Sequence, residues 1–203
     1  MTVPVRHDEH RGRPRHGADR DRAVAAVREL LDALGEDLAR PGIVRTPDRV
    51  ADLFLELTSG IGADVADALG EPIPVADGTG GELIAVTGIR FRALCEHHLL
   101  PFDGVADVYY RPRSLLAGFG RIAALVDRAS RRPQLQETLG AGIADALVSR
   151  LTPYGVAVRI EARHECMNQF APSTADARVV TIAGSGSMAD VSWLLAEPRC
   201  GRD

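Results

Sequence analysis

The sequence has few cysteines, no excess of basic residues and no long apolar run, and each shortage argues against a class of protein. Three cysteines in 203 residues are not the dense, even set that crosslinks small secreted domains. A formal net charge of -4 argues against a nucleic-acid binder that relies on a basic surface. No apolar run approaches the ~20 residues of a membrane span, and the first residues lack a signal peptide's apolar core. We therefore expect a cytoplasmic protein with reduced thiols and with neither nucleic acid nor membrane as a partner.

The rest of the composition is that of an ordinary globular protein, with 45% hydrophobic and 26% charged residues. Residues 1–20 hold five arginines and three histidines without apolar periodicity, which predicts a flexible leader. Residues 21–203 are long enough for a single domain with a sizeable core.

Apolar spacing predicts pairs of helices and strands in alternation along this domain. An N-terminal helical segment is expected over 22–58, followed by a long Gly- and Pro-containing connection over 60–81. The predicted helices are 22–34, 46–57, 121–130 and 134–151, and the predicted strands are 83–94 with a break at Gly88, 104–110, one from 156 onward, and 178–183. This order indicates an α+β fold with an antiparallel sheet.

The strand that begins at Val156 alternates strictly, with apolar side chains at 156, 158, 160 and 162 and charged ones between them. Successive side chains of a strand point to opposite faces of the sheet. If the alternation continues, His164 and Cys166 emerge on the apolar face, where burial would shield a metal from water.

Cys95, His98 and Cys166 form a candidate zinc site. Zinc is commonly held by cysteine sulfur and histidine nitrogen, and catalytic sites use three protein ligands and one water. Cys95 and His98 are three residues apart, so one turn can direct both at one ion, whereas Cys166 has to be brought in by the fold. His97 and His164 adjoin these ligands without being needed as ligands. An unperturbed pKa near ~6.5 suits both to proton transfer.

Two simpler interpretations of these residues stay open at this point. A single Cys-x-x-His is a weak signal, since a free cysteine is often buried only because it packs well. Cys95 and Cys166 could also form a disulfide, although the chain lacks the cysteine framework that is typical of disulfide-rich domains.

Four motifs sharpen the interpretation, and together they are highly specific. They are Arg45-Thr-Pro-Asp-Arg-Val50, Cys95-Glu-His-His-Leu-Leu-Pro-Phe102, Gln134-Leu-Gln-Glu137 directly after Arg131-Arg132-Pro133, and His164-x-Cys-Met167. In this order and at this spacing, over roughly residues 22–183, the chain resembles the GTP cyclohydrolase I family.

The resemblance implies the tunnelling fold, in which antiparallel sheets with helices on one face join between subunits into an oligomeric barrel. Residues 82–183 would be its catalytic part. Members are homo-oligomers, commonly decamers, with active sites at subunit interfaces. The implied reaction converts GTP and water into 7,8-dihydroneopterin triphosphate and formate for folate and pterin pathways. Water attacks C8 of the guanine ring, the imidazole part opens, C8 leaves as formate and the remainder closes to a pterin.

The resemblance also implies a role for each matching residue. Cys95, His98 and Cys166 would hold Zn²⁺, His97 and His164 would move protons, Gln136 and Glu137 would line the guanine pocket, and Arg121 and Arg49 would contact phosphate. A carboxylate suits guanine, because it can accept two hydrogen bonds, from N1–H and the 2-amino group.

The sequence departs from the family pattern in the triphosphate region. Members usually have Gly-Leu-Ser-Lys, an arginine three residues later, and Arg-Gly four residues after the second cysteine. Here these stretches read Gly118-Phe-Gly-Arg121, then Ala124, then Phe170. Two arginines are therefore missing, and each charge-assisted bond to phosphate contributes about 1.5–3 kcal/mol.

Three hypotheses follow from this departure. The first is a cyclohydrolase of the GTP cyclohydrolase I type in which Arg131, Arg132 or Arg178 replaces the lost contacts. The second is a divergent relative that acts on a guanine nucleoside, monophosphate or analogue. The third is a non-catalytic metal-containing binding protein, which the two additional histidines argue against.

Overall fold

The computed structural model describes residues 17–75, 80–170, 173 and 177–196. The chain divides into two compact units, Met1–Leu55 and Glu56–Asp203. Most of the expected flexible leader, residues 1–16, lies outside the described residues. The predicted sheet and the predicted metal ligands all belong to the second unit.

Two helices make up the described part of the N-terminal unit, α1 (Arg20–Ala33) and α2 (Thr46–Leu57), the second ending just beyond it. They confirm the helical segment predicted from apolar spacing. Arg20 links the two helices, because its Nε lies 2.6 Å from Asp52 Oδ1 and its Nη2 lies 3.2 Å from Asp48 Oδ1. These ion pairs are largely exposed, so each contributes at most about 1 kcal/mol.

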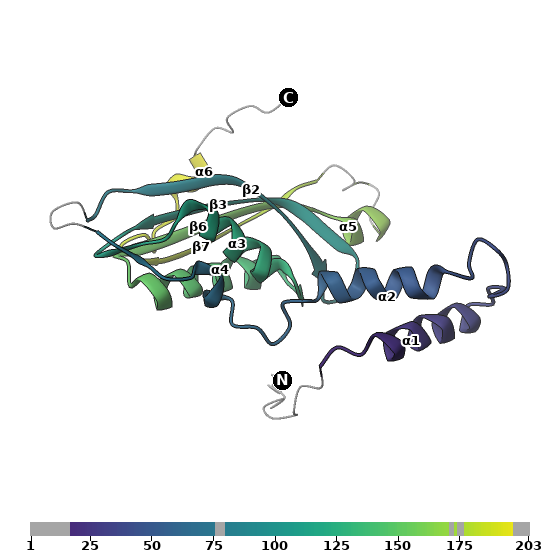
Figure 1. The fold of residues 1–203 in the computed structure, drawn as a ribbon. Coiled ribbons are helices and arrows are strands. Elements are labelled where there is room, and N and C mark those ends of the chain that lie inside the picture. The colour runs from purple at the N-terminus through teal and green to yellow at the C-terminus, as the bar shows by residue number, and fades with distance from the viewer. Residues whose placement is uncertain (1–16, 76–79, 171–172, 174–176, 197–203) are drawn as a thin grey trace, which may run out of the picture. The chain divides into compact units, whose positions relative to one another are not determined.

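The second unit is built on a five-stranded sheet in the spatial order β5-β2-β3-β6-β7 (Figure 1). Its strands are β2 (Ile84–Cys95), β3 (Pro101–Arg111), β5 (Pro133–Gln134), β6 (Gly155–His164) and β7 (Val179–Gly186). The four long strands pair antiparallel, and β5 adds a short parallel pairing beside the end of β2. A separate antiparallel pair joins β1 (Ile73–Pro74) to β4 (Leu115–Leu116). The predicted α+β fold with an antiparallel sheet is confirmed.

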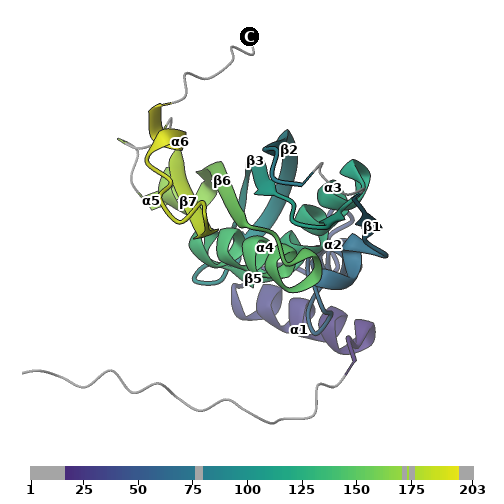
Figure 2. The same cartoon turned by 90° about the vertical axis from the view of Figure 1, so that its left-hand side faces the viewer.

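Two long helices cover one face of the sheet, as Figures 1 and 2 show. α3 (Phe119–Ser130) lies against β2, and α4 (Gln136–Leu151) lies against β6 and β7. The predicted alternation of β6 explains this burial, because its even-numbered side chains from Val156 to Ala162 are 0% exposed and belong to the main core. On the opposite face, Leu194 from the short α6 (Trp193–Ala196) packs in a smaller cluster. That cluster also contains Tyr109, Ala157 and Met188.

Three expectations about local structure are corrected by the fold. The helix expected from Gln134 begins at Gln136, because Gln134 pairs with Cys95 in the sheet. The expected continuation of β6 to Cys166 is wrong: the strand ends at His164, near the start of its partner β3, and the helix α5 (Glu165–Phe170) follows. The expected connection over 60–81 contains a 3₁₀ helix (Ala66–Leu69) as well as β1. The expected break at Gly88 is confirmed as a β-bulge.

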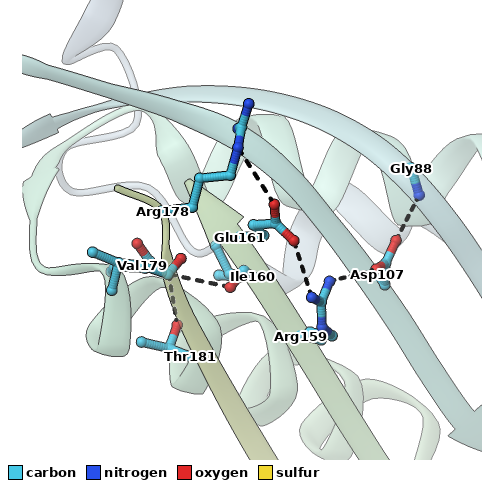
Figure 3. A network of polar contacts seen from close by, with 9 residues as sticks. Gly88, Asp107, Arg159, Ile160, Glu161, Arg178, Val179 and Thr181 are labelled. Carbon is cyan, nitrogen blue, oxygen red and sulfur yellow. Dashed lines mark hydrogen bonds and ion pairs between the residues drawn. The ribbon is translucent and has the colours of Figure 1, made fainter. Parts of the chain in front are cut away.

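An ion-pair network occupies the sheet face opposite the long helices (Figure 3). Arg159 lies at its centre, with Nη1 3.4 Å from Asp107 Oδ2 and Nη2 3.0 Å from Glu161 Oε2. The Asp107 carboxylate also accepts a 2.7 Å hydrogen bond from the backbone N–H of the Gly88 bulge. At the edge of the network, Arg178 Nε lies 3.7 Å from Glu161 Oε1.

We expect Arg159→Met to lower the free energy of unfolding by about 2 kcal/mol, because it removes a guanidinium that two largely buried carboxylates share. The side chains of Arg159 and Glu161 are only 16% and 8% exposed. Arg178→Met is the matched control, since its side chain is 45% exposed and should cost less than about 1 kcal/mol. Urea unfolding at one fixed protein concentration measures both. If both variants lost the same free energy of unfolding, burial would not determine how much each arginine contributes to stability.

Gly104 is required by the close approach of β3 and β6. A Cβ atom built on Gly104 meets the carbonyl oxygen of Glu161 and lies 2.7 Å from the Cα of Ala162. Gly104→Ala should therefore destabilise the protein by about 2–3 kcal/mol, because the strand backbones must separate. Gly142→Ala in α4 is the control: a Cβ there meets nothing within 4 Å. It should stabilise the helix by about 0.5–1 kcal/mol, and the same unfolding measurement separates the two effects.

Candidate metal centre

A tight turn between β2 and β3 carries the first two predicted ligands. β2 ends at Cys95, whose N–H donates to Leu100 O at 2.9 Å and whose carbonyl accepts from Leu99 N–H at 2.8 Å. Leu99 has a left-handed backbone with φ 55°, which closes the turn. His98 lies within this turn, so local backbone geometry alone places it beside Cys95.

Cys166 reaches the same place through the sheet. Phe102 at the start of β3 pairs with His164 at the end of β6, and α5 begins one residue later. The potential ligand atoms of Cys95, His98 and Cys166 all lie within 4.8 Å of one another. Tetrahedral ligands of one zinc ion at about 2.0–2.3 Å lie roughly 3.3–3.8 Å apart, so small side-chain movements would let the three residues share an ion.

The chemistry of the two cysteines supports a cation at this position. Both are free thiols, and Cys95 is buried. Burial, and then the neighbouring Cys95, raise the pKa of the Cys166 thiol. A thiol that resists ionisation, as Cys166 does, is an ordinary metal ligand once a cation compensates the charge of its thiolate. Among the described residues, no further His, Cys, Asp or Glu joins the group.

The two remaining histidines of the motifs lie beside this group in different surroundings. His97 is exposed, and its ring is 6.2 Å from that of His98 at an interplanar angle of 90°. His164 is half-buried and stacks on Phe102, with ring centroids 4.7 Å apart and planes 1° apart. Its Nε2 lies 2.7 Å from Gln136 Oε1. Burial lowers the pKa of His164, and the charge of Glu137 partly opposes this shift.

The two residues that were assigned to the guanine pocket behave differently. Gln136 and Glu137 both occupy the first turn of α4. Glu137 is exposed, and its charge acts on His164. Gln136 is only 2% exposed, and its amide is surrounded by hydrogen-bonding partners of the protein itself.

Within the second unit, the predicted phosphate contact Arg121 is not brought to the metal group. Arg121 lies in the first turn of α3, which starts beyond the far end of β3. Ser130 is the last residue of α3 and lies about 14 Å further along the helix axis than Arg121. It shortly precedes β5, which pairs with β2 at Cys95. Arg49 belongs to α2 in the N-terminal unit.

The arginines considered as replacements already have protein partners. Arg131 pairs with Asp127 at 2.9 Å and with Glu56 at 3.3 Å. Arg132 donates to the carbonyls of Gly60 and Ala63. Arg178 pairs with a carboxylate in the network of Figure 3. The site of one missing family arginine holds Phe170, which is 68% exposed with its ring 5.1 Å from that of His98.

Phe102 is a site residue to which sequence reasoning gave no role. It stood inside the Cys-Glu-His-His motif as an ordinary apolar residue, yet it forms the stacking surface for His164. The pairing of the two strands could have identified it. β3 begins directly after the metal turn and pairs with β6, which carries His164, so a side chain at the start of β3 must lie against the His164 ring.

Fold and site together define an α+β protein with a group of two cysteines and one histidine suited to zinc, beside a second histidine and a carboxylate. A family model described as GTP cyclohydrolase I matches residues 23–195. The chain belongs to the GTP cyclohydrolase I family, which confirms the resemblance seen in its motifs.

Curated relatives of similar length support this membership. GTP cyclohydrolase 1 of Leifsonia xyli subsp. xyli is 44% identical over 174 residues, which cover 86% of this chain and 91% of the relative. GTP cyclohydrolase 1 of Caldanaerobacter subterraneus subsp. tengcongensis is 43% identical over 169 residues, covering 83% and 88%. That of Desulforamulus reducens is 44% identical over 162 residues, covering 79% and 85%. In the described part of the chain, no helix combines the length and apolarity needed to cross a membrane.

Proposed function

We propose that the protein is a zinc-dependent cyclohydrolase that converts GTP and water into 7,8-dihydroneopterin triphosphate and formate. The observation that carries this proposal is the convergence of Cys95, His98 and Cys166 within 4.8 Å, with His164 and Glu137 beside them. A purely structural metal site needs neither an adjacent half-buried histidine nor an exposed carboxylate whose charge acts on that histidine. The product class would serve pterin or folate synthesis.

Each residue of the group has a distinct task in this proposal. Cys95, His98 and Cys166 would hold Zn²⁺, which when bound would lower the pKa of a water to about 7 and so supply a nucleophile at neutral pH. His164, whose lowered pKa keeps it neutral near pH 7, can accept a proton and return it to the purine nitrogen as the ring opens. His97, exposed in the metal turn, can exchange protons with solvent.

Guanine selection falls to Glu137. Its carboxylate can accept hydrogen bonds from N1–H and from the 2-amino group, and it stands at the start of α4 next to the residue that contacts His164. A guanine held in this way would present its imidazole part toward the metal group. In this arrangement Glu137 binds the base, and the neighbouring His164 and metal group carry out the ring opening.

The active site would be completed by another copy of the chain. Arg121 lies at the end of the sheet away from the metal group, so it can reach the phosphates of a bound nucleotide only from a second subunit. Among the described residues, most of the outer edge of β2 and the outer edge of β7 have no partner strand. Such edges favour joining of sheets between subunits. We therefore propose a homo-oligomeric barrel of the tunnelling-fold type, with decamers as the expected size.

One observation favours a second candidate, a relative that acts on a guanine compound with fewer phosphates. Ala124 and Phe170 occupy positions where family members carry arginines, and Phe170 places an exposed apolar ring beside His98. A triphosphate with fewer cationic contacts would bind more weakly. A nucleoside or monophosphate would not suffer this loss.

A substrate panel with metal analysis tests these candidates. Zinc-loaded protein would be supplied with GTP, GMP and guanosine, and formate release and pterin fluorescence would be measured. Efficient turnover of GTP without preference for fewer phosphates supports the main proposal and eliminates the second candidate. A higher kcat/KM for GMP or guanosine reverses that ranking. Absence of formate from every guanine compound would make a non-catalytic metal-binding protein the better description.

A further inference from the structure

The side-chain amide of Gln136 lies behind His164 and is enclosed by the fold. Gln136 is 2% exposed, so almost no surface of it is available to a substrate. Its Nε2 lies 3.2 Å from the carbonyl oxygen of Ile160, 3.1 Å from that of Val179 and 3.1 Å from Thr181 Oγ1. Figure 3 shows these three partners close together on β6 and β7.

These partners fix which way the amide of Gln136 is turned. Two of the three are backbone carbonyl oxygens, which can only accept hydrogen bonds. The amide nitrogen must therefore face them, because an amide oxygen in that place would have to approach two other oxygens without a hydrogen between them. The oxygen Oε1 consequently faces His164, 2.7 Å from its Nε2.

The orientation of the amide determines the tautomer of His164. An amide oxygen only accepts, so Nε2 of His164 must carry the hydrogen of this bond. In the neutral ring, Nδ1 then has the free lone pair, and no described residue forms a hydrogen bond with it. The ring plane is set independently by Phe102, which is 0% exposed and stacks on His164 with planes 1° apart.

We infer that Gln136 is a positioning residue, which holds His164 in the Nε2–H tautomer and leaves Nδ1 as the nitrogen that exchanges protons with the substrate. This inference rests on the proposed function for the part that concerns catalysis. It replaces the expected role of Gln136 as a contact to guanine. For metal-ligating histidines, a hydrogen-bond partner that sets the tautomer and ring orientation typically contributes about 10–100-fold to metal affinity or activity, and we expect a similar effect on activity at His164.

The direct test is the nitrogen NMR spectrum of histidine-labelled, zinc-loaded, full-length protein, with His164→Ala used to assign the signals. We expect His164 in the wild type to show a protonated Nε2 and an unprotonated Nδ1. In Gln136→Met, which keeps the side-chain length but cannot accept this bond, we expect a mixture of tautomers. A wild-type signal from the Nδ1–H tautomer overturns the inference, whatever the variants do.

The kinetic test separates positioning from substrate contact. We expect Gln136→Met to lower kcat for GTP by about 10–100-fold and to change KM by less than about threefold, with zinc content retained. A large rise in KM with kcat unchanged would overturn the inference, because it would identify Gln136 as a substrate contact. If the wild type turns over no guanine compound, the proposed function fails, while the NMR measurement still decides the tautomer.

Gln134→Met is the matched control. Gln134 is also buried, at 5% exposure, and its Nε2 also donates to a backbone carbonyl, that of Ala129 at 2.7 Å. Within the described part of the chain, the amide of Gln134 donates to the carbonyls of Ala129 and Arg132 and forms no hydrogen bond with a histidine. Loss of a buried amide should thus destabilise both variants similarly, but only Gln136→Met should change the His164 signals. The same spectral change in Gln134→Met would show a general loosening of the fold and overturn the inference.

Discussion

Cys166→Ser is expected to remove the bound metal and to lower GTP turnover by at least about 1000-fold. Cys166 is the one ligand that does not come from the β2–β3 turn, so without it the turn offers only Cys95 and His98. Two ligands hold zinc poorly, and a serine hydroxyl does not ionise near neutral pH as a metal-bound thiol does. Zinc per chain, measured by elemental analysis, and formate release are the two readouts.

Cys200→Ser controls for the loss of a cysteine as such. Cys200 is the third cysteine of the sequence and lies outside the described residues. Its replacement should leave zinc content and turnover unchanged. Far-UV circular dichroism of Cys166→Ser should resemble the wild type, because Cys166 lies in a short helix with no fully buried residue. Full zinc content and activity in Cys166→Ser would remove Cys166 from the metal site and with it the proposed mechanism.

The Cys95 and His98 half of the metal group could be predicted from the sequence because these two residues are local, whereas Cys166 is brought to them by the sheet. The Cys95 to His98 spacing needs only one turn, and the alternation of β6 correctly placed His164 on the face of the sheet that carries the main core. Alternation failed at Cys166, since a strand continues only as far as its partner does. β3 starts near Phe102, so the chain beyond His164 turns into α5.

The parts that the sequence could not supply depend on distant contacts. Gln136 and Glu137 look equivalent as neighbours in one motif, yet one is buried against β6 and β7 and the other is exposed. Arg121 resembles a phosphate contact by motif, but only the topology shows that α3 starts at the opposite end of the sheet from Cys95. Glu161 lies on the charged face of β6, as the alternation predicts, but the sequence does not show that this residue belongs to an ion-pair network. None of these long-range relationships follows from spacing along the chain.

Glu137→Gln should lower kcat/KM for GTP by about 1000-fold, the second large effect that the site predicts. The carboxylate of Glu137 can accept from both N1–H and the 2-amino group of guanine, whereas a glutamine amide can accept only one of these bonds and turns a donor toward the other. Zinc content should not change, because Glu137 is not part of the metal group. The loss therefore belongs to recognition of the base.

Comparison of GTP with ITP, which lacks the 2-amino group, makes this prediction specific. The wild type should prefer GTP by about 100-fold, and Glu137→Gln should reduce the preference below about tenfold, because the bond that ITP cannot make is already impaired. Asp145→Asn is the control, since Asp145 is another exposed carboxylate of α4, about 12 Å further along the helix axis. It should leave kcat/KM and the preference unchanged. A Glu137→Gln variant with the wild-type preference for GTP would show that another group reads the guanine, and equal effects of the two variants would point to the general charge of α4.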